Sequence, residues 1–180
     1  LRIQNQDVDR RMKIAVTDAC IFIDIIELGL SGHFFNLPFK IHTTLDVLNE
    51  LYPSQRQVLN AFTEENKLVV HCLTDKEMVE ISQIAFPKSL SQVDRTVLYT
   101  AKKIDAMVIS SDKLVRNYSR GSSIEYHGML WVFDKMIEYV FLSKRDAAQK
   151  LKELISINAI YQNNKSLMEE FLVRIHEWGK

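Results

Sequence analysis

KIAVTD, from Lys13 to Asp18, mixes apolar and β-branched residues and ends in an acid. This composition predicts a buried parallel strand that carries Asp18 at its carboxyl end. AMVISSD, from Ala106 to Asp112, repeats the arrangement, and the helical pattern SQVDRTVLYTAKKI leads into it. Because parallel strands joined by right-handed crossovers end at one edge of a sheet, we expect Asp18 and Asp112 to lie close together.

Strand and helix patterns alternate along the rest of the chain. Further strands are expected at Lys67–Leu73 and near Ile124–His127, where apolar residues cluster. This rhythm predicts a doubly wound parallel sheet. Helices are expected at Cys20–Leu28, Ser91–Ile104, Met129–Leu142, Arg145–Ser156 and Ser166–Trp178. Two more are expected between them: one begins at a cap formed by Thr43 or Thr44 and is ended by Pro53, and the other is capped by Thr74 and ends before Pro87.

Composition indicates a globular protein with one core. The chain has 180 residues, of which 47% are hydrophobic and 26% charged. Lys and Arg total 23, as do Asp and Glu, so the net charge offers no general attraction to nucleic acid. Any nucleic-acid binding must therefore depend on local clusters of basic residues.

Three segments differ in pattern. Residues 1–11 are polar and lack apolar periodicity, so they are interpreted as an N-terminal arm or as foreign to a natural chain that begins at Met12. Residues 12–142 form the expected α/β domain, and residues 143–180 a C-terminal helical extension packed on it.

The two cysteines and the apolar runs favour a cytoplasmic protein. Cys20 and Cys72 have no zinc-binding spacing and are expected to be reduced, buried thiols. Apolar runs such as Met129–Phe133 are far shorter than the roughly 20 residues that span a bilayer. The N-terminus resembles no signal peptide, so no membrane association is expected.

Four separated acids carry the predicted chemistry. Asp94 lies in the first turn of the helix that leads into the second strand, and Glu50 lies on a helix one turn after Asp46. Two carboxylates ~4 Å apart repel by about 4 kcal/mol at an effective dielectric constant of about 20, so a cluster of them needs a cation. Mg²⁺ or Mn²⁺ suits such a site, because both prefer oxygen ligands.

Three segments resemble, in order, the motifs of PIN domains: VTDACIFID, TTLDVLNEL and SLSQVDRTVLYTAKKIDAMVISSD. The resemblance covers Lys13 to Glu138 and looks closest to the VapC-type toxins of bacterial toxin-antitoxin pairs. It implies a three-layer α/β/α sandwich with a central parallel sheet, a metal-dependent ribonuclease activity, a homodimer and a small antitoxin whose segment fills the cleft. The metal-binding and catalytic residues implied are Asp18, Glu50, Asp94 and Asp112.

The chain departs from the PIN pattern in two places. Many relatives have a further acid shortly after the last aspartate, whereas Asp112 is followed by Lys113, Leu114, Val115 and Arg116. One tightly bound ion is therefore as compatible with the sequence as two. Bulky Trp131 occupies a position where a small residue is expected, which alters the packing of the dimer or of the cleft.

Each acid also has a structural interpretation. Asp94 follows Ser91 by three residues, the spacing of a helix cap, and capping and metal binding can coexist. Glu50 could be a solvated helix acid, with Asp46 in its role. Asp24 is interpreted as a helix-face acid or as an outer support of the site, and Ser111 as a hydroxyl that holds Asp112 or a metal-bound water.

The segment KLVRNYSRGSS after Asp112 is a candidate RNA contact. Lys113, Arg116 and Arg120 lie near Tyr118, a mixture that could hold phosphates and stack a base. A solvated helix face explains the same pattern.

Three functions are compatible with these residues. The leading hypothesis is an endoribonuclease that uses Mg²⁺ or Mn²⁺ to cut single-stranded or looped RNA. A catalytically silent PIN-like module that binds a partner protein is the alternative. A phosphotransfer or phosphatase site is a third, but its expected second aspartate is absent because Cys20 stands two residues after Asp18.

Overall fold

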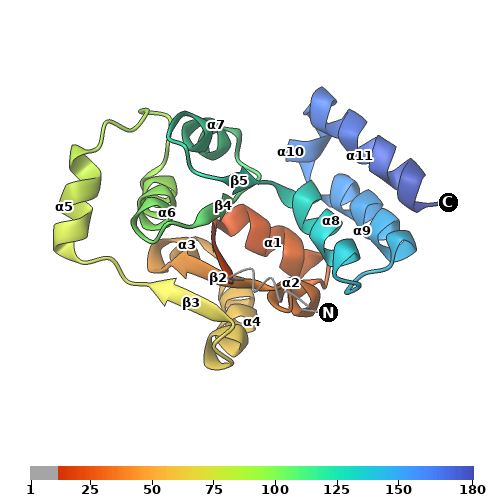
Figure 1. The fold of residues 1–180 in the computed structure, drawn as a ribbon, viewed down its shortest axis with the longest axis horizontal. Coiled ribbons are helices and arrows are strands. Elements are labelled where there is room, and N and C mark those ends of the chain that lie inside the picture. The colour runs from red at the N-terminus through yellow and green to blue at the C-terminus, as the bar shows by residue number, and fades with distance from the viewer. Residues whose placement is uncertain (1–11) are drawn as a thin grey trace, which may run out of the picture.

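A computed structural model describes residues 12–180, so the predicted N-terminal arm of residues 1–11 lies outside the described residues. Within them, the centre of the molecule is a five-stranded, all-parallel sheet with the order β3-β2-β1-β4-β5 (Figure 1). The strands are β1 (Lys13–Thr17), β2 (Phe39–Thr44), β3 (Leu68–His71), β4 (Met107–Ile109) and β5 (Tyr126–His127).

Helices surround this sheet and continue beyond it at the C-terminal end, which confirms the predicted α/β/α sandwich with a helical extension. The helices are α1 (Ala19–Glu27), α2 (Ser31–Phe35), α3 (Leu45–Glu50), α4 (Pro53–Glu64), α5 (Asp75–Gln83), α6 (Gln92–Lys103), α7 (Lys113–Gly121), α8 (Met129–Glu138), α9 (Lys144–Ile157), α10 (Ala159–Gln162) and α11 (Lys165–Trp178).

Strand β1 is the middle of the sheet and explains the apolar character of the first motif. Ala15 pairs with Ile41 of β2 on one side and with Met107 of β4 on the other. Ala15 and Val16 have no exposed surface, because helices cover both faces of a parallel sheet. The apolar residues of the motif thus form the core, and Asp18 is left at the strand's carboxyl end.

Strand β2 does not follow from the sequence pattern. FKIHTT contains Lys40 and His42, which interrupt the apolar run expected of a buried strand. Lys40 is exposed, and the Nδ1 atom of His42 lies 2.8 Å from Nε2 of His71 on β3, so both polar side chains are accommodated. Thr44 has two roles, as the last residue of β2 and as the cap of α3.

Two further expectations need correction. Pro53 does not merely follow the helix containing Glu50; it is the first residue of α4, where its missing N–H costs nothing. Cys72 is exposed, whereas Cys20 is partly buried, so the prediction of two buried thiols is wrong for Cys72. Cys72 follows the short strand β3, which lies at an edge of the sheet.

The C-terminal helices share the core of the sheet domain. Helix α9 contacts α8, and α11 packs along α9 (Figure 1). Leu151 of α9 and Phe171 of α11 are fully buried and belong to the same apolar cluster as Val16. None of the helices in residues 12–180 combines the length and apolar character needed to cross a membrane.

We expect Phe171→Ala to destabilise the whole protein by about 3 kcal/mol or more, because it removes a buried aromatic ring and leaves a cavity. Leu172→Ala is the matched control, since the neighbouring Leu172 side chain is 56% exposed. Urea unfolding followed by circular dichroism measures both free energies. Equal, small effects would show that α11 does not belong to the cooperative core.

Candidate active site at the carboxyl edge of the sheet

The strand order reverses between β1 and β4. From β1 the chain proceeds to β2 and β3 on one side of the sheet, and β4 and β5 are added on the other. In open α/β sheets ligands bind in the crevice beyond the carboxyl ends of the two strands at such a switch point. Here these ends carry Asp18 after β1 and Ser110, Ser111 and Asp112 after β4.

Asp18 is the most enclosed acid of the site, with 3% of its surface exposed. Its Oδ1 atom accepts a hydrogen bond of 3.2 Å from the backbone N–H of Ile21 and so caps α1. Its Oδ2 atom accepts a short hydrogen bond from the hydroxyl of Ser110. The backbone N–H of Asp112 donates to the same Ser110 hydroxyl, at 3.0 Å. Ser110 therefore joins the ends of β1 and β4.

Burial raises the pKa of Asp18 from its usual value of 3.8 to about 7. The hydrogen bonds from Ser110 and Ile21 lower this pKa, and the negative charges of Asp94 and Asp112 raise it further. Burial also raises the pKa of Cys20, with contributions from the same acids. Asp18, Asp94 and Asp112 thus lie within one electrostatic neighbourhood.

Asp94 and Asp112 both cap helices. Asp94 accepts a 2.9 Å hydrogen bond from the backbone N–H of Ser91, whose hydroxyl accepts from the N–H of Asp94 at 3.0 Å. Asp112 accepts from the N–H groups of Leu114 and Val115 through one oxygen, Oδ1. The second oxygen of each carboxylate has no hydrogen-bond partner among residues 12–180.

Glu50 is exposed at the end of α3. Partial burial, followed by the charges of Asp94 and Asp46, raises its pKa. Glu50 therefore shares the electrostatic field of Asp94. Because Asp94 and Asp46 are the acids that act on Glu50, it is assigned to the margin of the acidic group.

Buried threonines fix the strand ends beneath the acids. The hydroxyl of Thr17 donates to the carbonyl oxygen of Ile109 at 3.0 Å, and that of Thr43 donates to the carbonyl oxygen of Thr17 at 2.9 Å. The hydroxyls of Thr44 and Thr96 are 3.0 Å apart, which ties α6, the helix of Asp94, to the end of β2. The sequence does not predict these contacts, because β-branched Thr is common in strands whatever its hydroxyl contacts.

Asp24 and Ser111 belong to a second network, formed with the C-terminal extension. Asp24 is 3% exposed and accepts hydrogen bonds from the hydroxyl of Tyr161 and, at 2.9 Å, from Nδ2 of Asn158. The Tyr161 hydroxyl also lies 2.8 Å from that of Ser111. The backbone N–H of Asp112 donates to Ser110 and not to Ser111, so the predicted support of Asp112 or a metal-bound water by Ser111 stays a prediction. Burial of Asp24 raises its pKa, against the effect of both donors.

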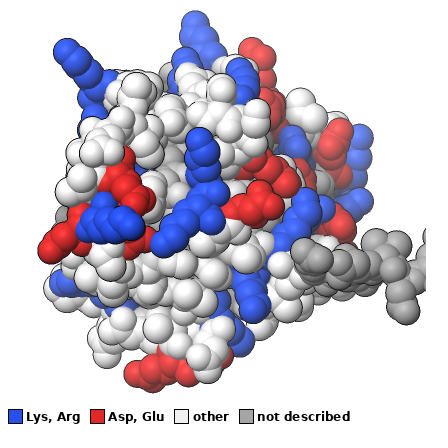
Figure 2. Space-filling model, turned by 60° about the vertical axis from the view of Figure 1, so that its left-hand side comes forward, with Lys and Arg blue, Asp and Glu red and all other residues white. Residues whose placement is uncertain are grey.

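The predicted RNA contacts, Lys113, Arg116 and Arg120, line a 340 Å³ hollow between α7 and α11. Tyr118 is not part of it, because its ring packs on Phe86 at 4.9 Å between centroids. Tyr126 takes its place, with its hydroxyl accepting from Nε of Arg120 at 2.9 Å. Acidic and basic side chains are intermixed on the face seen in Figure 2, in keeping with the zero net charge.

The donor types of this edge suit a hard divalent cation. Carboxylate oxygens are the preferred ligands of Mg²⁺ and Mn²⁺, and burial of Asp18 without a compensating cation favours its protonated form. As arranged in residues 12–180, no group of three Asp, Glu, His or Cys side chains could hold a metal ion. Mg²⁺ commonly takes only one or two carboxylates and completes its shell with water and substrate phosphate. The acids therefore fit an ion in chemistry, with one or two of them as its ligands.

The fold is a parallel α/β sandwich with acids at its carboxyl edge, and comparison with known proteins identifies the family. Residues 14–177 match the family model DUF3368, described as a PIN domain. The chain belongs to the PIN-domain family. PIN domains are generally nucleases and typically use divalent metal ions.

One solved structure similar to the chain is that of a PilT N-terminus domain protein, SSO1118, from the hyperthermophilic archaeon Sulfolobus solfataricus P2. The identity is 16% and the TM-score 0.49, over 69% of this chain and 94% of that one. No curated protein matches the chain.

We expect Asp18→Asn to be more stable than the natural protein at pH 8 in the presence of a chelator, by up to about 4 kcal/mol. The folded protein binds a proton at Asp18 more tightly than the unfolded chain, so this residue lowers stability as pH rises from 3.8 to about 7. Asparagine cannot ionise and avoids that loss.

Urea unfolding of both proteins between pH 4 and pH 8 measures the difference, which should vanish at the acidic end. Glu64→Gln, an exposed site on α4, serves as the control. A difference independent of pH would mean that Asp18 is not protonated in the folded state.

Proposed function

We propose that this chain is a divalent-metal-dependent endoribonuclease of PIN type. The observation that carries the proposal is the buried carboxylate of Asp18 at the switch point, in the field of Asp94 and Asp112. An acid buried where an open α/β sheet binds ligands, with two further acids in its electrostatic field, favours a site that takes a cation together with an anionic substrate.

Asp18, Asp94 and Asp112 are the proposed ligands; one or two of them would hold the ion, with water and substrate phosphate completing its shell, and Glu50 lies at the margin. A bound divalent ion supplies charge compensation for a scissile phosphate and a lowered pKa for a bound water. Ser110 fixes the orientation of Asp18 by its hydrogen bond, and the free second oxygens of Asp94 and Asp112 are available as ligands. The proposed acids supply oxygen ligands and no covalent nucleophile.

Lys113, Arg116 and Arg120 are proposed to contact RNA, with Lys113 and Arg120 holding its phosphates. All three line one hollow on α7, which starts directly after Asp112. Their positions would lead a single strand from the acids towards Tyr126. Because the whole protein is neutral, this local cluster must provide the attraction that the net charge does not.

We further propose that this nuclease is the toxin of a toxin-antitoxin pair. This role rests on the resemblance of the acid motifs to VapC-type toxins, which also implies a homodimer and an antitoxin segment in the cleft. Tyr139, Val140 and Phe141, at the turn after α8, are exposed and apolar, and they offer a surface for such a protein contact.

A catalytically silent, partner-binding PIN module is the second candidate. Asp94 and Asp112 are already engaged as helix caps, and the acids do not form a ready three-ligand group within residues 12–180. In such a module the acids would serve the fold alone.

We expect the purified chain to cleave a mixed, partly structured RNA with Mn²⁺ or Mg²⁺ and not with chelator, and Asp18→Asn to reduce the rate by at least about 100-fold, a typical effect of losing an electrostatic catalytic group. Asp105→Asn is the matched control, because Asp105 is exposed before β4, at the opposite end of that strand from the site. Gel analysis of the products gives the rates. Full activity of Asp18→Asn would refute the assignment.

We expect Mn²⁺ or Mg²⁺ to raise the melting temperature of the natural protein, because an ion that binds only the folded state stabilises it by mass action. The shift should disappear in Asp18→Asn and persist in Asp105→Asn. Differential scanning fluorimetry over an ion titration measures it. A natural protein without any shift and without cleavage would favour the partner-binding module.

A further inference from the structure

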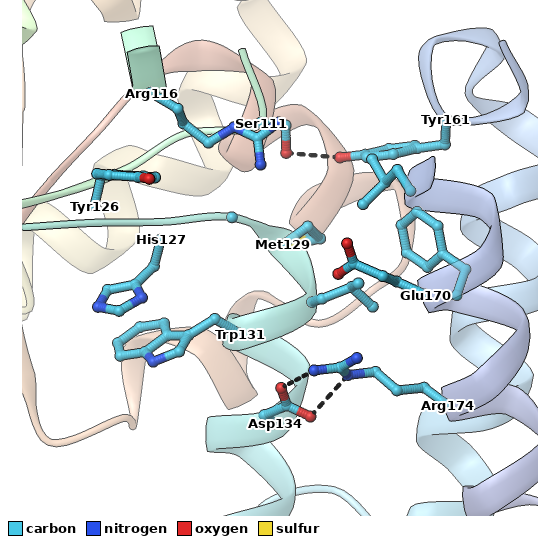
Figure 3. Close-up of a pocket in the computed structure, with 14 residues that line it drawn as sticks. Ser111, Arg116, Tyr126, His127, Met129, Trp131, Asp134, Tyr161, Glu170 and Arg174 are labelled. Atoms are coloured by element: carbon cyan, nitrogen blue, oxygen red, sulfur yellow. Dashed lines mark hydrogen bonds and ion pairs between the residues drawn. The ribbon is translucent and has the colours of Figure 1, made fainter. Parts of the chain in front are cut away.

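A second hollow of 260 Å³ lies between the edge of the sheet and the C-terminal extension (Figure 3). We call it the β5–α11 hollow; its defining residues are Arg116, Tyr126, His127, Trp131, Tyr161 and Glu170. It shares Arg116, Tyr126, Leu167 and Glu170 with the hollow that contains Lys113 and Arg120, and Ser111, next to Asp112, lines it as well. The β5–α11 hollow therefore lies beside the candidate active site.

Aromatic rings line one side of the β5–α11 hollow. The imidazole of His127 stacks on Trp131 with 4.0 Å between centroids and 9° between planes. His127 is also held at its edge by Glu125, with Nε2 and Oε1 2.9 Å apart. Tyr126 lies above this pair (Figure 3). The orientation of His127 is thus fixed, and a planar ligand could stack there without reordering it.

Two groups of opposite hydrogen-bonding character face the same space. Figure 3 shows the guanidinium of Arg116 pointing in from α7 and the carboxylate of Glu170 pointing in from α11. The Nε atom of Arg116 is buried and has no partner in the described part of the chain. Glu170 likewise has no hydrogen-bond or ion-pair partner among residues 12–180, although Arg174 close by is paired with Asp134.

We propose that the β5–α11 hollow binds an unpaired guanine of single-stranded RNA, with Glu170 accepting hydrogen bonds from the base and Arg116 donating to it. This inference rests on the proposed function, because it assigns a base preference to the same RNA substrate. The aromatic side at His127 would stack the ring, while the phosphate of that nucleotide would lie towards the basic residues of α7.

Guanine fits these groups better than the other bases. A carboxylate only accepts hydrogen bonds, and guanine presents two adjacent donors, N1–H and the N2 amino group, on its Watson–Crick edge. Its O6 and N7 atoms accept, and arginine is the side chain that most often binds them. Adenine and cytosine each offer a single amino group, and uracil offers a single ring N–H.

An RNA strand fits the surroundings better than a partner protein. The β5–α11 hollow adjoins the hollow that contains Lys113 and Arg120, since Arg116, Tyr126, Leu167 and Glu170 line both. A basic groove beside aromatic rings is the usual arrangement for a single strand, since phosphates and bases are held by different groups.

The test measures RNA binding without cleavage. Asp18→Asn protein in chelator is titrated into fluorescein-labelled six-nucleotide RNAs that differ only in one central base, G, A, C or U, and anisotropy gives each Kd. We expect the G oligomer to bind best. Glu170→Gln, added to Asp18→Asn, should weaken its binding by about tenfold, the loss expected when one bidentate pair is broken, and remove its advantage over A.

Glu169→Gln is the matched control, because Glu169 is exposed on the same helix and lines neither hollow. It should keep the preference for G. The inference is overturned if G and A bind equally, if the preference survives Glu170→Gln, or if no RNA binds, the outcome expected of a site for a partner protein.

Unlabelled 5′-GMP added as a competitor distinguishes a strand from a free nucleotide. We expect it to compete far more weakly than the G oligomer, because it lacks the neighbouring phosphates. Equal affinity would assign the hollow to a free nucleotide and overturn the RNA assignment. Cleavage without base preference would refute this inference alone, whereas base preference without cleavage would refute only the proposed nuclease.

Discussion

The carboxylate of Asp18 is buried at the centre of the sheet edge, and the surrounding structure is organised by what that burial requires. An ionised carboxylate removed from water is costly unless donors or a cation compensate it. Ser110 and the N-terminus of α1 provide donors, but the neighbouring acids add repulsion, so at neutral pH the compensation stays incomplete. A buried, incompletely compensated carboxylate lowers the free energy of unfolding. Such destabilising groups are common at sites that bind a substrate or an ion.

The site is supported from two directions. Thr17 and Thr43 join the strand ends from within the sheet, whereas Tyr161 and Asn158 reach Asp24 from the C-terminal extension. The extension therefore does more than cover apolar surface. It completes the hydrogen bonds of a buried carboxylate on α1 and forms one wall of the hollow that adjoins the acids.

The sequence predicted the parallel sheet, the strand ends that carry Asp18 and Asp112, and the capping of α6 by Ser91, because each depends on a local pattern. It did not predict β2, whose polar residues are satisfied by a neighbouring strand. It also could not separate Ser110 from its neighbour, since only the path of the chain after β4 decides which hydroxyl faces Asp18. The contacts of Tyr161 could not be predicted for another reason. Tyr161 and Asp24 are 137 positions apart, and local sequence patterns carry no information about contacts between such distant segments.

That separation has a consequence for how the molecule forms on the ribosome. Asp24 and its partner Asn158 are 134 positions apart. At a synthesis rate of about 5–20 residues per second, Asn158 is therefore added to the chain roughly 7–27 s after Asp24. During this interval the β1–α1 unit can collapse, but Asp24 has neither Asn158 nor Tyr161 as a donor. The hydrogen bonds of this carboxylate to the extension therefore form only after nearly the whole chain has been made.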